Sequence, residues 1–143
     1  MNWLDILMQW LHLAAAVTGV GGVIYARVVV VPSLADLPAE SRTRLLAQLV
    51  ARFRPLSFTV IGVLLVTGLF NLLTHISEKP PQYHMVLGVK LLLALHVFTV
   101  SFLLAIPPGV NPGRDARRPQ LLMGAAISGI VILLLSAYLR RTF

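Results

Sequence analysis

The stretch Leu4–Val31 reads LDILMQWLHLAAAVTGVGGVIYARVVVV, and it decides the fold class of this chain. Between Asp5 and Arg27 its only charged or histidine side chain is His12. A helix needs about 20 predominantly apolar residues to cross the hydrocarbon core of a bilayer. Three further segments have a suitable length and composition: Leu56–Leu73, Met85–Ile106 and Leu121–Leu139. The sequence therefore predicts an integral membrane protein with four spanning helices.

The composition of the whole chain agrees with this prediction. Of the 143 residues 57% are apolar and only 12% are charged, and the mean hydropathy is +0.85. A soluble domain carries about 25% charged residues. Short connections make successive helices antiparallel, so we expect one all-α domain over residues 1–143, an up-down four-helix bundle. The chain has no cysteine, which excludes disulfides, iron–sulfur clusters and thiolate sites.

The N-terminal segment superficially resembles a secretory signal, because Ala14–Ala16 could imitate a cleavage site. A signal peptide begins with a positively charged region. The residues before the apolar run contain no lysine or arginine, and Asp5 lies among them. The run also continues well past the alanines. We therefore expect this segment to be retained as the first helix.

The basic residues are distributed asymmetrically between the two ends of the predicted helices. Cytoplasmic connections of membrane proteins carry an excess of lysine and arginine. The first and third connections hold Arg27, Arg42, Arg44, Arg52, Arg54, Arg114, Arg117 and Arg118, and the opposite side holds Lys79, Lys90, Arg140 and Arg141. We expect the first group in the cytoplasm and both termini outside an inner (plasma) membrane. The net charge of +7 thus reflects topology and not a nucleic-acid partner.

The first connection has a helical pattern of its own. Pro32 and the segment up to Pro38 are expected to end the first helix. Over residues 38–53 apolar side chains recur at three- and four-residue spacing with arginines between them. That pattern predicts a short amphipathic helix on the cytoplasmic surface. Arg54 and Pro55 would then start the second spanning helix.

His12 and His96 are the strongest candidates for a functional site. Ionisable groups deep in a bilayer are costly and mark sites of binding or relay. His12 lies nine residues after Trp3, about 13 Å along the helix, and His96 lies eleven residues after Met85, about 16 Å. Both helices enter from the outside. Two imidazoles at matching depth predict one ligand held between the first and third helices, and haem iron is the first choice.

Other polar and small residues extend this candidate site. Small residues on the stripe of His12 would leave room for a flat macrocycle or let a second helix approach closely, and Gly19 is the chief of these. On the second helix Asn71 is expected to support the ligand, with interhelical hydrogen bonding as the alternative. Lys90 would snorkel to the interface or meet an anionic group such as a propionate. Gly124 and Ser128 suggest close helix packing or a dimer surface.

Several short motifs resemble the small membrane proteins of the CopD-like and HemJ-like superfamily, which includes copper-resistance protein D and HemJ-type protoporphyrinogen oxidase. The motifs are LHLAAAVTGVGG at 11–22, IYAR at 24–27, RFRP at 52–55 followed by Thr67-Gly68, and VKLLLALH at 89–96. The resemblance implies a four-helix membrane fold and haem b. By that match His12 would be the haem ligand, with His96 or Lys90 as its counterpart. Gly19 replaces a HemJ aromatic and Ala26 a HemJ proline.

These observations favour a membrane haem b protein with a redox role. Electron transfer and porphyrinogen oxidation are its two forms, so a membrane oxidoreductase activity is one expectation. A quinone or a membrane redox protein would be the partner, and assembly into a homo-oligomer is compatible with the sequence. The alternative is copper binding or copper transport, since thioether and imidazole suit copper and Met8 lies one turn from His12. A structural protein without cofactor is the third hypothesis.

Overall fold

A computed structural model describes residues 2–143, and within that range helix is the only regular secondary structure. The helices are α1 (Trp3–Tyr25), η1 (Ala26–Val30), α2 (Val31–Ala35), α3 (Ala39–His75), η2 (Ile76–Glu78), α4 (Pro81–Ala105), α5 (Pro112–Ala116) and α6 (Arg118–Thr142). Elements that follow one another without a break form continuous helices. Four of these are long and apolar enough to cross a membrane: Trp3–Ala35, Ala39–Glu78, Pro81–Ala105 and Arg118–Thr142. The expected all-α class with four long apolar helices is confirmed.

The first long helix ends at Ala35, within the segment from Pro32 to Pro38 where its end was expected, but it continues through Pro32 itself. The π-helical turn η1 precedes the proline, and the Val31 amide donates to the carbonyl of Ala26. This wider turn gives room for the proline ring, which would otherwise clash with the preceding turn. The Ser33 hydroxyl donates to the Val29 carbonyl at 2.6 Å, and the helix ends only at Ala35.

The expectation of a separate amphipathic helix over residues 38–53 is wrong. Residues 39–53 form the first turns of α3, which runs unbroken to His75 with Pro55 inside it. An internal proline removes one backbone hydrogen bond and bends a helix, but it need not end one. The neighbouring Arg54 donates from Nε to the carbonyl of Ala105 on α4 at 3.0 Å. This contact ties α3 to a second helix next to its proline.

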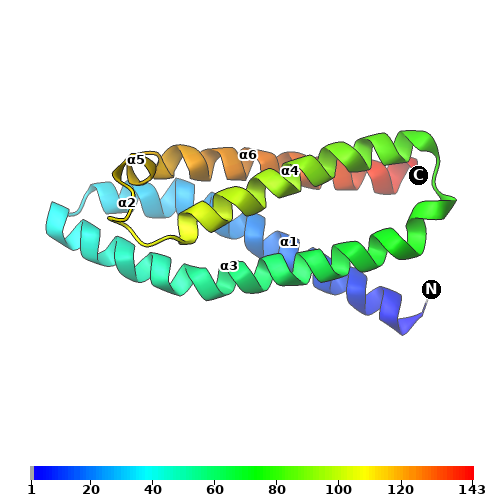
Figure 1. The fold of residues 1–143 in the computed structure, drawn as a ribbon, viewed down its shortest axis with the longest axis horizontal. Coiled ribbons are helices and arrows are strands. Elements are labelled where there is room, and N and C mark those ends of the chain that lie inside the picture. The colour runs from blue at the N-terminus through cyan, green and yellow to red at the C-terminus, as the bar shows by residue number, and fades with distance from the viewer. Residues whose placement is uncertain (1) are drawn as a thin grey trace.

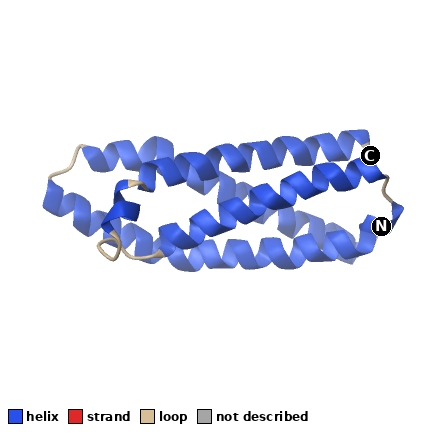
Figure 2. Cartoon of the chain, turned by 45° about the horizontal axis from the view of Figure 1, so that its top comes forward, coloured by secondary structure: helices blue, strands red, loops and turns tan. Residues whose placement is uncertain are grey.

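The long helices lie side by side and alternate in direction, with short connections between them (Figures 1 and 2). α1 packs against α3 and α6, and α4 packs against α6 and, less extensively, α3. Both termini lie at one end of the molecule, and α2 and α5 lie at the other (Figure 1). The arginine-rich connections therefore share one end, which we call the basic end.

The buried apolar core lies near the basic end. Its members are Val23, Val100, Leu104, Ala125 and Ala126, which come from α1, α4 and α6. Each lies within about two turns of the end of its helix that faces the arginine-rich connections. Large exposed apolar side chains instead occur along all four long helices, among them Trp10, Leu73, Leu92 and Leu134. Of the candidate site residues, His12 lies in the half of its helix nearer the termini, whereas His96 lies past the midpoint of α4 toward the basic end.

Gly129 allows α6 to pack closely against α1, and Gly129→Ala is expected to destabilise the protein by about 1–3 kcal/mol. A Cβ at this position would lie 2.9 Å from Cγ2 of Val20. Valine is rotationally restricted in a helix, so its side chain cannot turn away freely. Gly21→Ala is the control, because a Cβ there meets nothing within 4 Å. Equal unfolding free energies of the two variants in detergent would contradict close packing at Gly129.

Candidate functional site

His12 is held by a hydrogen bond between α1 and α3. Its Nδ1 lies 2.8 Å from Oγ1 of Thr67, and the same hydroxyl donates to the carbonyl of Val63 at 2.6 Å. Because that proton goes to Val63, the hydroxyl accepts from Nδ1–H of His12. Thr67 is 2% exposed, and Gly68 beside it would place a Cβ only 3.5 Å from Cε1 of His12. The hydrogen bond fixes the orientation of the imidazole, and the lone pair on Nε2 remains free.

His96 is held in a similar way between α4 and α6. Its Nδ1 lies 2.9 Å from Oγ of Ser128, and Ser128 is buried. A Cβ on Gly124, one turn before Ser128, would lie 3.7 Å from Cε1 of His96. The histidine itself is exposed on the helix surface. We expected Gly124 and Ser128 to serve close helix packing. They also contact the side chain of His96.

The two histidines contact different helix pairs and differ in their distance from the helix starts. α4 begins at Pro81, four residues before the start expected from sequence, because proline suits the first position of a helix. His96 is therefore 15 residues into its helix, about 22 Å, whereas His12 remains about 13 Å from Trp3. Lys90 is nine residues into α4, the same distance along its helix as His12.

Lys90 of α4 interacts electrostatically with His12 of α1. Its ammonium is half-buried and lies within electrostatic range of both His12 and Arg140 of α6. The ion pairs within residues 2–143 involve neither Lys90 nor Arg140. One cation without a carboxylate partner, Lys90, thus lies near the imidazole, and a second, Arg140, lies near Lys90. Such a place suits an anionic group.

The remaining candidates from the sequence have more ordinary surroundings. Gly19 faces α3, and a Cβ there would lie 3.0 Å from Cγ1 of Val60, which favours its role in helix packing. Asn71 is half-buried one turn beyond Thr67. Its side chain makes no hydrogen bond within the described part of the chain. His75 and His84 are exposed near the ends of their helices.

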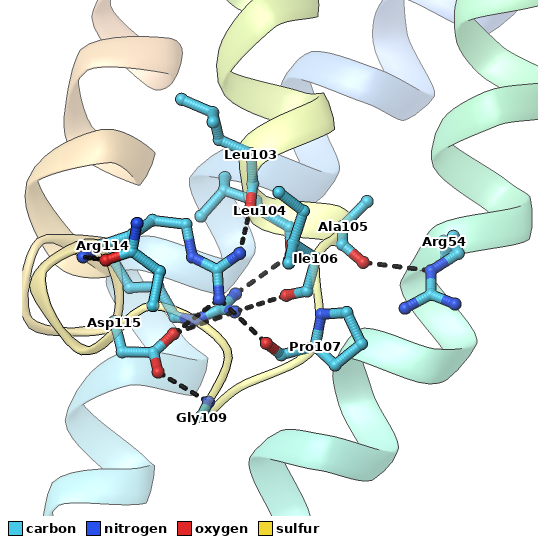
Figure 3. Close-up of polar contacts among 11 residues, drawn as sticks. Arg54, Leu103, Leu104, Ala105, Ile106, Pro107, Gly109, Arg114 and Asp115 are labelled. Carbon is cyan, nitrogen blue, oxygen red and sulfur yellow. Dashed lines mark hydrogen bonds and ion pairs between the residues drawn. The ribbon is translucent and has the colours of Figure 1, made fainter.

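Three arginines of the basic end form a second polar cluster, which the sequence analysis treated only as a topology signal. The last carbonyls of any helix lack partners within it. At the end of α4 the carbonyls of Leu103, Leu104 and Ala105 accept from Arg114, Arg118 and Arg54, respectively (Figure 3). Arg114 also donates to Pro107, and Arg118 to Ile106. Positive charge is favourable at a helix C-terminus, so these side chains cap α4.

Asp115 completes this cluster. Its carboxylate accepts from Arg114 at 2.8 Å and from the backbone amide of Gly109 at 2.7 Å, and Arg118 lies 3.6 Å away (Figure 3). Gly109 has φ +92°, a conformation that favours glycine. The hydrogen bond from Arg114, then that from Gly109, lowers the pKa of Asp115 below its usual range. The carboxylate is therefore held in its charged form.

Asp115→Asn is expected to lower the unfolding free energy at neutral pH by about 1–2 kcal/mol, because the charged hydrogen bonds are weakened. A carboxyl whose folded pKa is depressed stabilises the protein above its unfolded pKa, about 3.9. That stabilisation is lost as the pH falls through the folded pKa. The difference in unfolding free energy between wild type and variant should thus be constant from pH 7 to about pH 5 and should shrink below about pH 4. A difference that persists unchanged at lower pH would contradict this role.

Within residues 2–143 no group of three or more His, Cys, Asp or Glu side chains could hold a metal ion. An axial haem ligand requires a single imidazole, so this observation bears on a protein-only metal site and not on haem. No protein-family model matches the chain, and no curated protein or solved structure is detectably similar to it.

Proposed function

We propose that this chain is a multi-pass membrane protein that binds haem b between its helices and transfers electrons. Its membrane placement is supported by four long apolar helices whose surfaces carry large exposed apolar side chains. The basic end would face the cytoplasm and the termini the outside of the inner membrane. A reporter fused after Arg44 should then read cytoplasmic, and one fused after Phe143 should read external.

The observation that carries the haem proposal is the fixed imidazole of His12. Histidines that ligate metals usually donate their second ring N–H to a protein group, which sets the tautomer and ring orientation. Thr67 provides that acceptor at 2.8 Å and is itself buried. The neutral imidazole with a free Nε2 fits an axial iron ligand. His12 is therefore the proposed ligand of the haem.

The charges around His12 fit the rest of the cofactor. Haem b carries two propionates. Lys90 lies near His12 and Arg140 lies near Lys90, and the described ion pairs include neither cation. These side chains would bind the propionates and orient the macrocycle. The bound haem would supply one-electron chemistry, and the apolar helices would exclude water from it. This is the chemistry expected of a HemJ-like or related membrane redox protein.

The second axial position has two candidates on α4, His96 and Lys90. His96 has a fixed ring orientation in its favour, since its Nδ1 lies 2.9 Å from Oγ of the buried Ser128. Lys90 has the better position, since it lies as far along α4 as His12 lies along α1. Single variants separate the two. Loss of a low-spin spectrum in His96→Ala but not in Lys90→Met would assign His96, and the reverse would assign Lys90.

The test of the proposal is an absorbance spectrum of detergent-purified protein, oxidised and dithionite-reduced, with metal analysis. A Soret band and reduced α band with stoichiometric iron are expected. A colourless protein that contains copper after purification with Cu(I) would favour the CopD-like alternative. A colourless protein without either metal would leave a structural role.

A further inference from the structure

A groove between α3 and α4 at the basic end differs from the rest of the surface. It encloses about 390 Å³ and is lined by Arg54, Phe58, Phe102, Leu103, Ile106 and Pro107. Apart from one guanidinium, these side chains are apolar. Two of the lining residues, Phe58 and Phe102, have ring centroids 5.3 Å apart and planes inclined by 40°. This aromatic pair joins α3 and α4, which pack less extensively against each other than α4 packs against α6 or α1 against α3.

Arg54 has unused donors at this groove. Its Nε donates to the carbonyl of Ala105, which holds the guanidinium in place. Neither of its two terminal nitrogens donates a hydrogen bond within residues 2–143 (Figure 3). The ion pairs of the described chain do not include Arg54. A planar fork of this kind matches a phosphate group, which accepts two parallel hydrogen bonds.

We propose that this groove binds an anionic phospholipid, with its phosphate on Arg54 and an acyl chain over Phe58 and Phe102. The assignment rests on the proposed membrane placement but not on haem binding. Phe58 and Phe102 are 43% and 52% exposed on helices that would face lipid, so an acyl chain can reach them from the bilayer. Arg54 lies within α3 beside Ala105, the last residue of α4, and the proposed membrane placement would put this end of α4 near the lipid headgroups. The surrounding arginines favour a headgroup with net negative charge.

Native mass spectrometry of the full chain in detergent, with added phosphatidylglycerol or phosphatidylcholine, tests this assignment. The wild type should retain phosphatidylglycerol preferentially. Arg54→Gln should weaken retention about tenfold, the loss of one charged hydrogen-bonding group. Arg52→Gln is the matched control, because it removes the same charge from an exposed residue of the same helix. Equal losses in the two variants would show general attraction to a basic surface and overturn the site.

A second pair of variants leaves the Arg54 contact with Ala105 intact. Phe102→Ala should reduce phosphatidylglycerol retention, whereas Leu92→Ala, at a 69% exposed position on the same helix, should not. Unchanged retention in Phe102→Ala would overturn the acyl-chain position. If millimolar inorganic phosphate displaces the lipid, the groove is a site for free anions and the phospholipid assignment is overturned. If phosphatidylcholine is retained as well as phosphatidylglycerol, the proposed selectivity for an anionic headgroup is overturned. The haem spectrum of each variant is expected to stay normal, so failure of this proposal is distinguishable from failure of haem binding.

Discussion

Replacing His12 with alanine is expected to abolish haem binding while the protein still inserts into the membrane. The imidazole of His12 has a buried hydrogen-bond partner, Thr67, and lies near the unpaired cation Lys90. Its removal leaves no histidine in α1. The measurement is the ratio of Soret absorbance to protein, together with membrane recovery. A normal spectrum in His12→Ala would remove the proposed site.

Thr67→Val sharpens this test, because valine keeps the branched shape and removes the hydroxyl that orients His12. Loss of such a supporting hydrogen bond costs about 10–100-fold in metal affinity. We therefore expect weakened haem retention, and we expect Thr67→Ser to restore it. His75→Ala and His84→Ala are controls, since both side chains are exposed near the helix ends. Haem loss in these controls as well would point to a general disturbance of the protein.

The four long helices could be predicted from the sequence because each contains an apolar run of spanning length. Their ends could not, because the effect of a proline depends on its surroundings. A π turn accommodates Pro32, and α3 continues through Pro55 beside a residue anchored to α4. Pro81 begins a helix where Met85 was expected to lie at its start. The apparent match in depth between the two histidines depended on that boundary.

The site was only partly predictable for a related reason. His12 and His96 stand out because they are rare residue types in apolar runs. Their partners do not, since a threonine or serine in a membrane helix usually hydrogen-bonds to its own backbone. The contacts of Thr67 with His12 and of Ser128 with His96 depend on helix rotation, which the apolar pattern leaves undetermined. The proximity of Lys90 to His12 depends on the arrangement of α1 and α4.

The arginine cluster had a signal that the sequence analysis did not use. α4 has no basic residue in its last turn, and the residues after it are Ile106, two prolines and Gly109. Prolines cannot donate a backbone hydrogen bond, so the final carbonyls of α4 need donors from elsewhere. The arginines that follow in the next connection are the nearest strong donors. Counting them only as topology signals missed this role.

Arg118→Met is expected to be among the most destabilising single substitutions, with a loss of about 3–5 kcal/mol in unfolding free energy. The Arg118 side chain is 9% exposed, and its guanidinium donates to Leu104 at 3.0 Å and Ile106 at 2.9 Å. Methionine fills similar space but leaves both carbonyls without a donor. It also removes a charge that lies near Asp115. The measurement is denaturant or thermal unfolding in detergent.

Arg117→Met is the matched control, because it removes the same charge from an exposed side chain one residue earlier and should change stability by less than about 0.5 kcal/mol. The stability loss of Arg118→Lys should lie between those of Arg118→Met and Arg117→Met. An ammonium keeps the charge but lacks the planar guanidinium that reaches two carbonyls. If the Arg118 and Arg117 variants were equally stable, the guanidinium would not be capping α4. A large loss of unfolding free energy for Arg118 alone would show that its guanidinium, and not positive charge at this end in general, caps α4.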